Sequence, residues 1–187
     1  MLSGPQLKLD QATYHLNNMQ AKVEQLKLEE FAYELSAFIE SSRNITFAMQ
    51  STYSKNPQFN AWYKTKQEEM QKDPILKFFK DKRTDVTKRG HPGYNAYSFE
   101  VVFKTNLPPG ESAWITFPDG FSLDDIRIRA ETVTGKEVSF TREKVKKTPI
   151  FKEFDSRHVV EVCKDYLEKL RKLVHESEDI FGNNVKK

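Results

Sequence analysis

Near the N-terminus the apolar residues recur at intervals of three and four, which is the spacing of one buried face of an α-helix. The pattern slips by two residues partway along, although no Gly or Pro lies at the slip. The first set is Leu9, Ala12, Leu16, Met19, Val23 and Leu26, and the second is Leu28, Phe31, Ala32, Leu35, Phe38, Ile39, Ile45 and Met49. We therefore expect a tight break within residues 22–27 between two antiparallel helices; a rotation of the buried face is the alternative.

Two proline-containing pairs predict where the next helices begin. Asn56-Pro57 precedes an aromatic-rich helical pattern, and Asp73-Pro74 restarts a helix after it. The side chain of Asn or Asp can cap a helix, and proline suits the first helical position, where its missing N–H costs nothing. Both pairs therefore predict helix starts.

The longest regular apolar stripe of the chain lies near the C-terminus, from Val159 to Val174, and predicts the last helix. Phe154 and Val159 flank Asp155 in the way that a hydrophobic staple flanks an N-cap. We expect this helix to begin after Asp155.

Between the fourth and the last expected helix the period of the apolar pattern changes from 3.6 to 2, which is typical of strands. Short alternating segments, divided by Pro, Gly and Asp turns, lie around residues 97–103, 114–117, 126–131 and 138–140. They predict a four-stranded antiparallel β-meander with one polar face. The expected fold class is α+β: an antiparallel helical bundle of residues 1–95 and 143–187, with the meander inserted at 96–142 before the last helix.

The composition indicates the cellular environment of the protein more clearly than its biochemical activity. The net charge is +3, from 30 Lys and Arg against 27 Asp and Glu, which is too small to imply nucleic-acid binding without local clustering. The single cysteine, Cys163, excludes an internal disulfide and fits a reducing compartment. No apolar run approaches the roughly 20 residues of a membrane span, and the N-terminus lacks a signal-peptide core. We expect a soluble cytoplasmic protein without a membrane partner, and the absence of standard motifs predicts neither a metal site nor a cofactor.

Basic residues cluster in the stretch "KFFKDKRTDVTKRGHPG", residues 77–93, which begins as an amphipathic helix and ends at Pro-Gly. A second basic group lies within residues 136–152. Together the two groups could line a phosphate-binding surface, and ordinary solvated faces are the alternative. The predicted phosphate or RNA contacts are Lys80, Lys82, Arg83, Lys88 and Arg89.

The polar run Ser41-Ser42-Arg43-Asn44 interrupts the second apolar stripe, and Ser42 occupies a stripe position. Polar groups that face a bundle core need hydrogen-bonding partners. The run therefore predicts either a buried hydrogen-bond network or the wall of a site.

Three segments, "FAYELSAFIESSRNITFAMQ", "FNAWYKTKQEEM" and "DPILKFFKDKR", resemble uncharacterised bacterial proteins of the HEPN-like superfamily. The resemblance covers roughly the first 95 residues and, more loosely, the last helix. It implies a helical bundle that often dimerises, and many active members are metal-independent endoribonucleases of toxin–antitoxin, abortive-infection and CRISPR systems. Their motif is an Arg, usually followed by a polar residue, with a His five positions after the Arg. Arg83 and Thr84 fit its start, whereas Lys88 stands at the histidine position and His91 lies three residues beyond.

That departure from the motif bears on catalysis. Attack by a ribose 2′-OH needs a general base near neutral pKa and a cation for the phosphate. Arg83 could hold the phosphate through two hydrogen bonds, but Lys88 with an ordinary pKa near 10.4 is protonated at neutral pH. If the site is catalytic, its residues are Arg83, Lys88 and His91, with His91 serving only if the loop bends suitably.

We therefore expect an HEPN-like module that binds RNA or a nucleotide, or acts as a regulator, with little or no catalytic activity. One alternative is a metal-independent endoribonuclease of a toxin–antitoxin or phage-defence system. Another is a protein–protein interaction module that recruits a partner strand to the edge of the meander. A homodimer is a further expectation of the resemblance.

Overall fold

The computed structural model describes the chain except for residues 1–2, 90–93, 95, 108–126, 132–136 and 183–187. The chain divides into two compact units, a helical unit of residues 1–97 and 149–187 and a strand unit of residues 98–148. Each unit is described separately below. No described helix combines the length and the apolar character needed to cross a membrane.

The helical unit begins with a hairpin of two long helices, α1 (Gly4–Glu24) and α2 (Leu28–Tyr53). The chain reverses over three residues, and Leu26 adopts a positive φ of 58°, which is a left-handed conformation suited to a helix end. The predicted break within residues 22–27 is thus confirmed. The apolar phase slips there because each helix turns its own stripe toward the same core.

The next two helices begin where the proline pairs predict. In α3 (Pro57–Lys72) the Asn56 side chain accepts hydrogen bonds from the first-turn N–H groups, and Pro57 occupies the first turn. In α4 (Pro74–Arg89) Asp73 Oδ1 accepts hydrogen bonds from the backbone N–H groups of Ile75 and Leu76. The second carboxylate oxygen of Asp73 accepts a hydrogen bond from Lys169 Nζ at 2.6 Å, which ties the junction of α3 and α4 to the last helix.

The last helix, α5 (Val159–Phe181), carries the predicted apolar stripe, which is buried. Its start, however, was predicted wrongly. The N-cap is His158 rather than Asp155, and Asp155 lies in the left-handed region, with a φ of 49°, directly after a short 3-10 helix, Lys152–Phe154. The chain forms one more bridge, β4 (Arg157–His158), before α5 begins.

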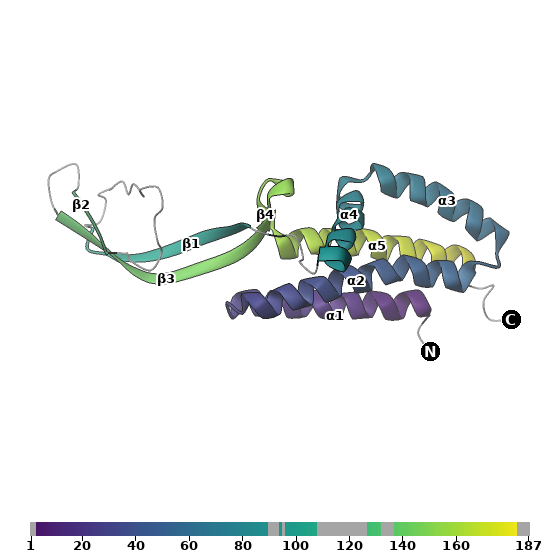
Figure 1. Ribbon diagram of the computed structural model, residues 1–187, viewed down its shortest axis with the longest axis horizontal. Coiled ribbons are helices and arrows are strands. Elements are labelled where there is room, and N and C mark those ends of the chain that lie inside the picture. The colour runs from purple at the N-terminus through teal and green to yellow at the C-terminus, as the bar shows by residue number, and fades with distance from the viewer. Residues whose placement is uncertain (1–2, 90–93, 95, 108–126, 132–136, 183–187) are drawn as a thin grey trace. The chain divides into compact units, whose positions relative to one another are not determined.

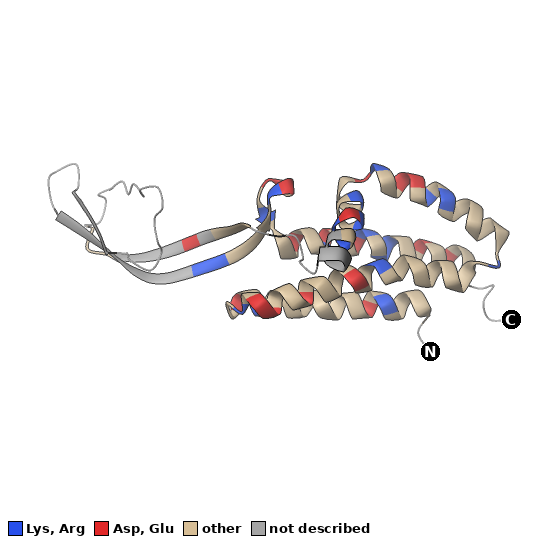
Figure 2. Cartoon of the chain, in the orientation of Figure 1, with Lys and Arg blue, Asp and Glu red and all other residues tan. Residues whose placement is uncertain are grey.

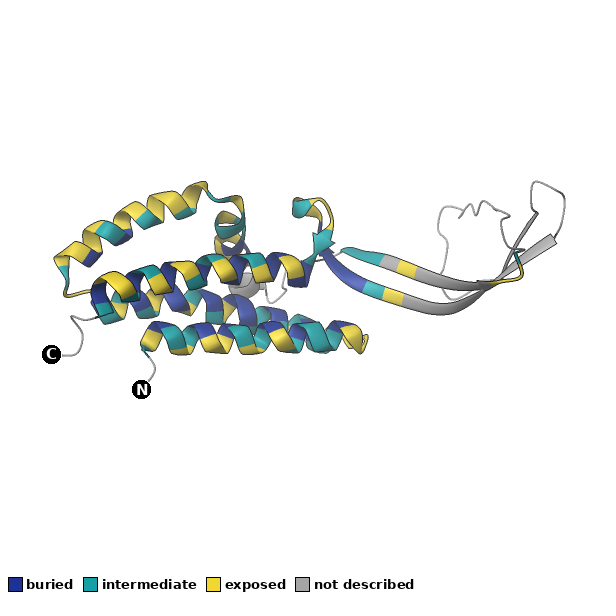
Figure 3. Ribbon diagram, turned by 180° about the vertical axis from the view of Figure 1, so that it is seen from behind, coloured by how far each residue is buried: buried dark blue, intermediate teal, exposed yellow. Residues whose placement is uncertain are grey.

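The core of the helical unit lies among α1, α2 and α5, which run side by side, while α4 crosses them (Figure 1). Each of these helices buries one stripe and exposes the opposite one (Figure 3). In α3 the buried residues are Phe59 and Tyr63, so most of this helix is exposed. The helical bundle is confirmed; its assignment to the HEPN-like superfamily stays a prediction.

Ser42 lies on the buried face of α2 and has no exposed surface. Among the described residues its hydroxyl finds no hydrogen-bond partner. The predicted hydrogen-bond network is therefore absent at this position. The desolvation free energy of a buried hydroxyl without a partner is not offset by a hydrogen bond in the folded protein.

We expect Ser42→Ala to leave the free energy of unfolding unchanged or to raise it by up to about 1 kcal/mol, because it removes an unpaired hydroxyl and favours helix. Urea denaturation followed by circular dichroism measures the change. Ser36→Ala is the matched control, since the half-buried Ser36 hydroxyl donates to the Ala32 carbonyl. A loss above about 1 kcal/mol in Ser42→Ala would contradict the absence of a partner.

The described strands form a small antiparallel sheet in which β3 (Glu137–Phe151) is central. β1 (Ala96–Thr105) and β2 (Arg127–Glu131) flank β3, so the spatial order is β1-β3-β2. β2 pairs antiparallel with β3, with Arg127 opposite Thr141, and β4 pairs antiparallel with the end of β3. The segment expected as a strand at residues 114–117 lies outside the described residues. An antiparallel sheet is confirmed, while the four-stranded meander and strand addition at its edge stay predictions.

Candidate functional site

Arg83 lies on α4, six positions before the helix ends at Arg89, and is half-buried. Its guanidinium carbon lies 5.7 Å from the centre of the Phe47 ring on α2. Lys88 and Arg89 belong to the last turn of α4, but their side chains, like the whole of His91, lie outside the described residues. The pairing of Arg83 with Lys88 or His91 is therefore still a prediction.

Lys82, the neighbour of Arg83, is packed into the protein, with 8% of its surface exposed. Its ammonium forms an ion pair with Glu153 at 3.2 Å and lies over the ring of Phe78 at 5.1 Å. The structure thus places this cation in the packing of α4 against residues 151–154. Its partner is already a carboxylate of the same chain.

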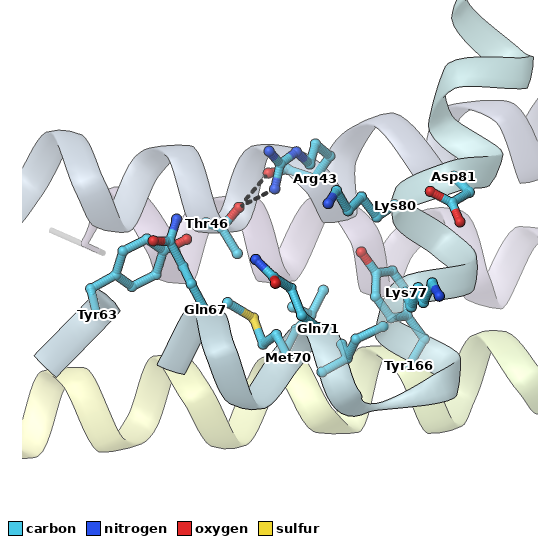
Figure 4. Close-up of a pocket in the computed structure, with 12 residues that line it drawn as sticks. Arg43, Thr46, Tyr63, Gln67, Met70, Gln71, Lys77, Lys80, Asp81 and Tyr166 are labelled. Carbon is cyan, nitrogen blue, oxygen red and sulfur yellow. Dashed lines mark hydrogen bonds between the residues drawn. The ribbon is translucent and has the colours of Figure 1, made fainter. Parts of the chain in front are cut away.

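A second arginine shares the aromatic ring that Arg83 approaches. The Arg43 guanidinium carbon, on α2, lies 4.4 Å from the centre of the Phe47 ring. Arg43 Nη1 also donates to the Thr46 hydroxyl at 3.2 Å (Figure 4). Phe47 is 42% exposed, and cation–π attraction helps to orient both guanidinium groups around its ring.

Acidic and basic positions are interspersed over most of the helices, so local pairing decides where positive charge remains (Figure 2). On α3 and α5, Lys66 pairs with Glu69 and Glu176, and Lys169 pairs with Asp73. The cations around Arg43 differ: Arg43 and Arg83 approach the Phe47 ring, and Lys77 and Lys80 line a pocket together with Arg43. Within the part of the chain that the structure describes, Arg43, Lys77, Lys80 and Arg83 form no ion pair. This region of α2 and α4, which we call the Phe47 surface (Arg43, Phe47, Lys80 and Arg83), is consequently positively polarised.

A pocket of about 380 Å³ adjoins the Phe47 surface and is walled by α2, α3, α4 and α5 (Figure 4). Arg43 and Lys80 belong to both the pocket and the surface. The wall carries one carboxylate, that of Asp81, and three cationic side chains, those of Arg43, Lys77 and Lys80. Of the described pocket residues, none is histidine or cysteine, and no three His, Cys, Asp or Glu side chains gather as a metal site would need.

Two tyrosines present hydroxyl groups to this pocket. Tyr63 on α3 accepts a hydrogen bond from Gln50 Nε2 at 3.3 Å. Tyr166 on α5 is 7% exposed, and its ring stacks on Phe79 with centroids 4.1 Å apart. Within the described residues the Tyr166 hydroxyl makes no hydrogen bond, and it points into the pocket (Figure 4).

Burial raises the pKa of Tyr166 well above its ordinary value, although the nearby Arg43 guanidinium acts in the opposite direction. Burial likewise raises the pKa of Tyr63, against hydrogen bonding to Thr46 and the charge of Arg43. Both phenols therefore stay protonated at neutral pH. They can donate hydrogen bonds to an anion, but they cannot act as general bases there.

The sequence pointed to part of this site. The polar run at residues 41–44 predicted either a buried hydrogen-bond network or the wall of a site. Arg43 of this run lines a pocket, which agrees with the second interpretation. Tyr166 gave no such signal, because it occupies a regular position of the α5 stripe and reads as a core residue. Only the fold brings it into the same pocket as Arg43.

One family model matches the chain, that of the family described as bacteriophage lambda protein ea47, over residues 8–103. The match covers slightly more than half of the 187 residues, from α1 through most of β1. It includes the Phe47 surface but not Tyr166. No curated protein and no solved structure matches the chain.

Proposed function

The chain belongs to the family of the bacteriophage lambda protein ea47, and we propose that it is an RNA-binding module that holds single-stranded RNA without cleaving it. The binding site is the Phe47 surface. The observation that carries the proposal is the approach of two guanidinium groups, each without a carboxylate partner among the described residues, to one exposed aromatic ring.

The chemistry of this surface matches that of single-stranded RNA. Arginine binds phosphate through two parallel hydrogen bonds, and its flat guanidinium also stacks on bases. An exposed phenylalanine offers a face or edge to an unstacked base. Because the neighbouring cations are unneutralised, a phosphate that arrives there displaces water and mobile ions rather than a protein carboxylate.

The absence of cleavage is proposed on the chemistry of the described neighbours. Metal-independent cleavage needs a base and an acid that exchange protons near neutral pH. The phenols of Tyr63 and Tyr166 are held protonated, and the described part of the pocket wall offers one carboxylate, Asp81. The HEPN-like resemblance supports RNA as the ligand and gives Arg83 the role of a phosphate contact.

Binding is tested by fluorescence anisotropy with a labelled single-stranded oligoribonucleotide at several salt concentrations. We expect Arg83→Ala, and separately Arg43→Ala, to weaken binding about tenfold and to reduce the salt slope by about one unit. Phe47→Ala should weaken binding by a similar factor, since base–aromatic stacking contributes about 1–3 kcal/mol, but should leave the salt slope unchanged.

Arg171→Ala is the matched control, because Arg171 is an arginine of α5 that is already paired with Glu168. It should bind RNA as the unchanged protein does. Equal affinity in Arg83→Ala, or binding that does not vary with salt, would refute the proposal. The same mixtures run on a denaturing gel test the ribonuclease alternative: cleavage that disappears in Arg83→Ala would replace a binding module with an enzyme.

A further inference from the structure

The pocket beside the Phe47 surface has a cationic end with a hydroxyl group. Lys80 from α4 and the Tyr166 hydroxyl extend into this cavity, and Arg43, whose guanidinium is turned toward Thr46, lines its α2 wall (Figure 4). The Tyr166 side chain is more than nine-tenths buried and has no hydrogen-bond partner among the described residues. The hydroxyl itself is open to the cavity, so it can donate a hydrogen bond to a ligand oxygen there.

The rest of the cavity has a different character. Gln67 and Gln71 lie four residues apart on α3, hence on one face of that helix, and both line the pocket. Neither amide forms a hydrogen bond within the described residues, so each can offer a donor and an acceptor to a ligand. Apolar surface from Met70, Leu76 and Leu170 lies among these polar groups.

Charge and size together limit what fits. The Asp81 carboxylate in the wall would repel a ligand with several anionic groups. A volume of about 380 Å³ lies near the lower end of small-molecule pockets, which span about 300–1,000 Å³. One anionic group with one compact, uncharged remainder satisfies both limits, whereas a length of RNA chain does not.

We propose that this pocket binds a small phosphate monoester whose remainder is uncharged and rich in hydrogen-bonding groups. The phosphate lies against Arg43, Lys80 and the Tyr166 hydroxyl. The remainder lies against the amides of Gln67 and Gln71. A sugar phosphate and a nucleoside monophosphate share this chemistry, and they differ in whether a base occupies the apolar part of the wall.

Binding in the pocket does not depend on the proposed RNA function, but its consequence does. Arg43 belongs to both the pocket and the Phe47 surface. A phosphate held by this guanidinium competes with an RNA phosphate for the same donors. The small ligand therefore weakens RNA binding, and by reciprocity RNA weakens binding of the ligand.

Isothermal titration calorimetry with ribose 5-phosphate, uridine 5′-monophosphate, inorganic phosphate and ribose tests the site. We expect both esters to bind more tightly than inorganic phosphate, and ribose not to bind. Tyr166→Phe keeps the ring that stacks on Phe79 and removes only the hydroxyl, so it should weaken ester binding about tenfold or more. Tyr33→Phe, at an exposed tyrosine of α2, is the matched control and should bind as the unchanged protein does.

Tighter binding of uridine 5′-monophosphate than of ribose 5-phosphate would support the inference with a nucleotide as ligand, and equal binding would support it with a sugar phosphate. No binding of either ester by the unchanged protein, or undiminished binding in a folded Tyr166→Phe, would overturn it. Failure of RNA binding alone leaves these titrations unaffected, because none contains RNA. The proposed function and the pocket can therefore fail separately.

Discussion

Phe79→Ala is expected to lower the free energy of unfolding by about 3–5 kcal/mol, the range for truncating a fully buried phenylalanine. Phe79 is 2% exposed and lies where α4 meets the rest of the helical unit. Its ring stacks on Tyr166 and meets Phe38 and Phe151 edge to face, with centroids 6.2 and 6.1 Å away. Removal of the ring therefore deprives three neighbours of contacts and leaves a cavity among them.

The loss is measured by urea denaturation followed by circular dichroism, with the slope of the transition checked for two-state behaviour. Phe47→Ala is the matched control: the same side chain is removed from a position that is 42% exposed, and a change below about 1 kcal/mol is expected. A loss below about 1.5 kcal/mol in Phe79→Ala would show that α4 packs on the bundle without depending on this ring. The two variants also separate functions, since only Phe47→Ala should impair RNA binding without loss of stability.

The helix starts could be predicted from sequence because their causes are local. Asn56 and Asp73 cap α3 and α4 with their own side chains, and the prolines that follow exclude other conformations. The turn at Leu26 was predictable from the phase of the apolar stripes, which reports how each helix faces the core. Such signals lie within a few residues of the feature that they specify.

The start of α5 was not predictable in the same way. Asp155 has the residue type of an N-cap and apolar neighbours at staple spacing, yet it ends a 3-10 turn instead. The chain continues through β4, whose pairing with β3 brings Arg157 opposite Phe151. This tertiary pairing outweighs the local capping signal. The backbone groups of β4 form hydrogen bonds with β3, and a helix that began at Asp155 would have to give up that pairing.

The candidate site shows the same division between local and distant causes. The basic cluster on α4 was visible in the sequence, but its adjacent residues Lys82 and Arg83 lie in different environments. Lys82 pairs with Glu153, whereas Arg83 approaches Phe47. Helical geometry separates neighbours by about 100° around the axis, so composition alone cannot distinguish them. Arg43 is 40 positions from Arg83 in sequence, and only the packing of α2 against α4 brings both to one ring.

Phe59→Ala is expected to have an equally large but more local effect. Phe59 is 1% exposed, as deeply buried as Phe79, and its ring meets Tyr53 on α2 and Phe181 on α5 at 5.1 and 5.4 Å. It is one of two buried side chains in α3, whereas the helices of the central core each bury a continuous stripe. The remaining ties of α3 to α5 include the Trp62–Glu176 hydrogen bond and the Lys66–Glu176 ion pair, and such partly exposed polar contacts contribute little.

Loss of the Phe59 ring should therefore release α3 while α1, α2 and α5 stay packed. Hydrogen exchange should show the amides of α3 exchanging at least about a hundredfold faster, with little change in the central helices. The amides of Gln67 and Gln71 would then leave the pocket wall, so ester binding should weaken while RNA binding at the Phe47 surface persists. Uniformly faster exchange in all helices would contradict this, because it would mean that α3 belongs to the same cooperative unit as the central core and cannot loosen on its own.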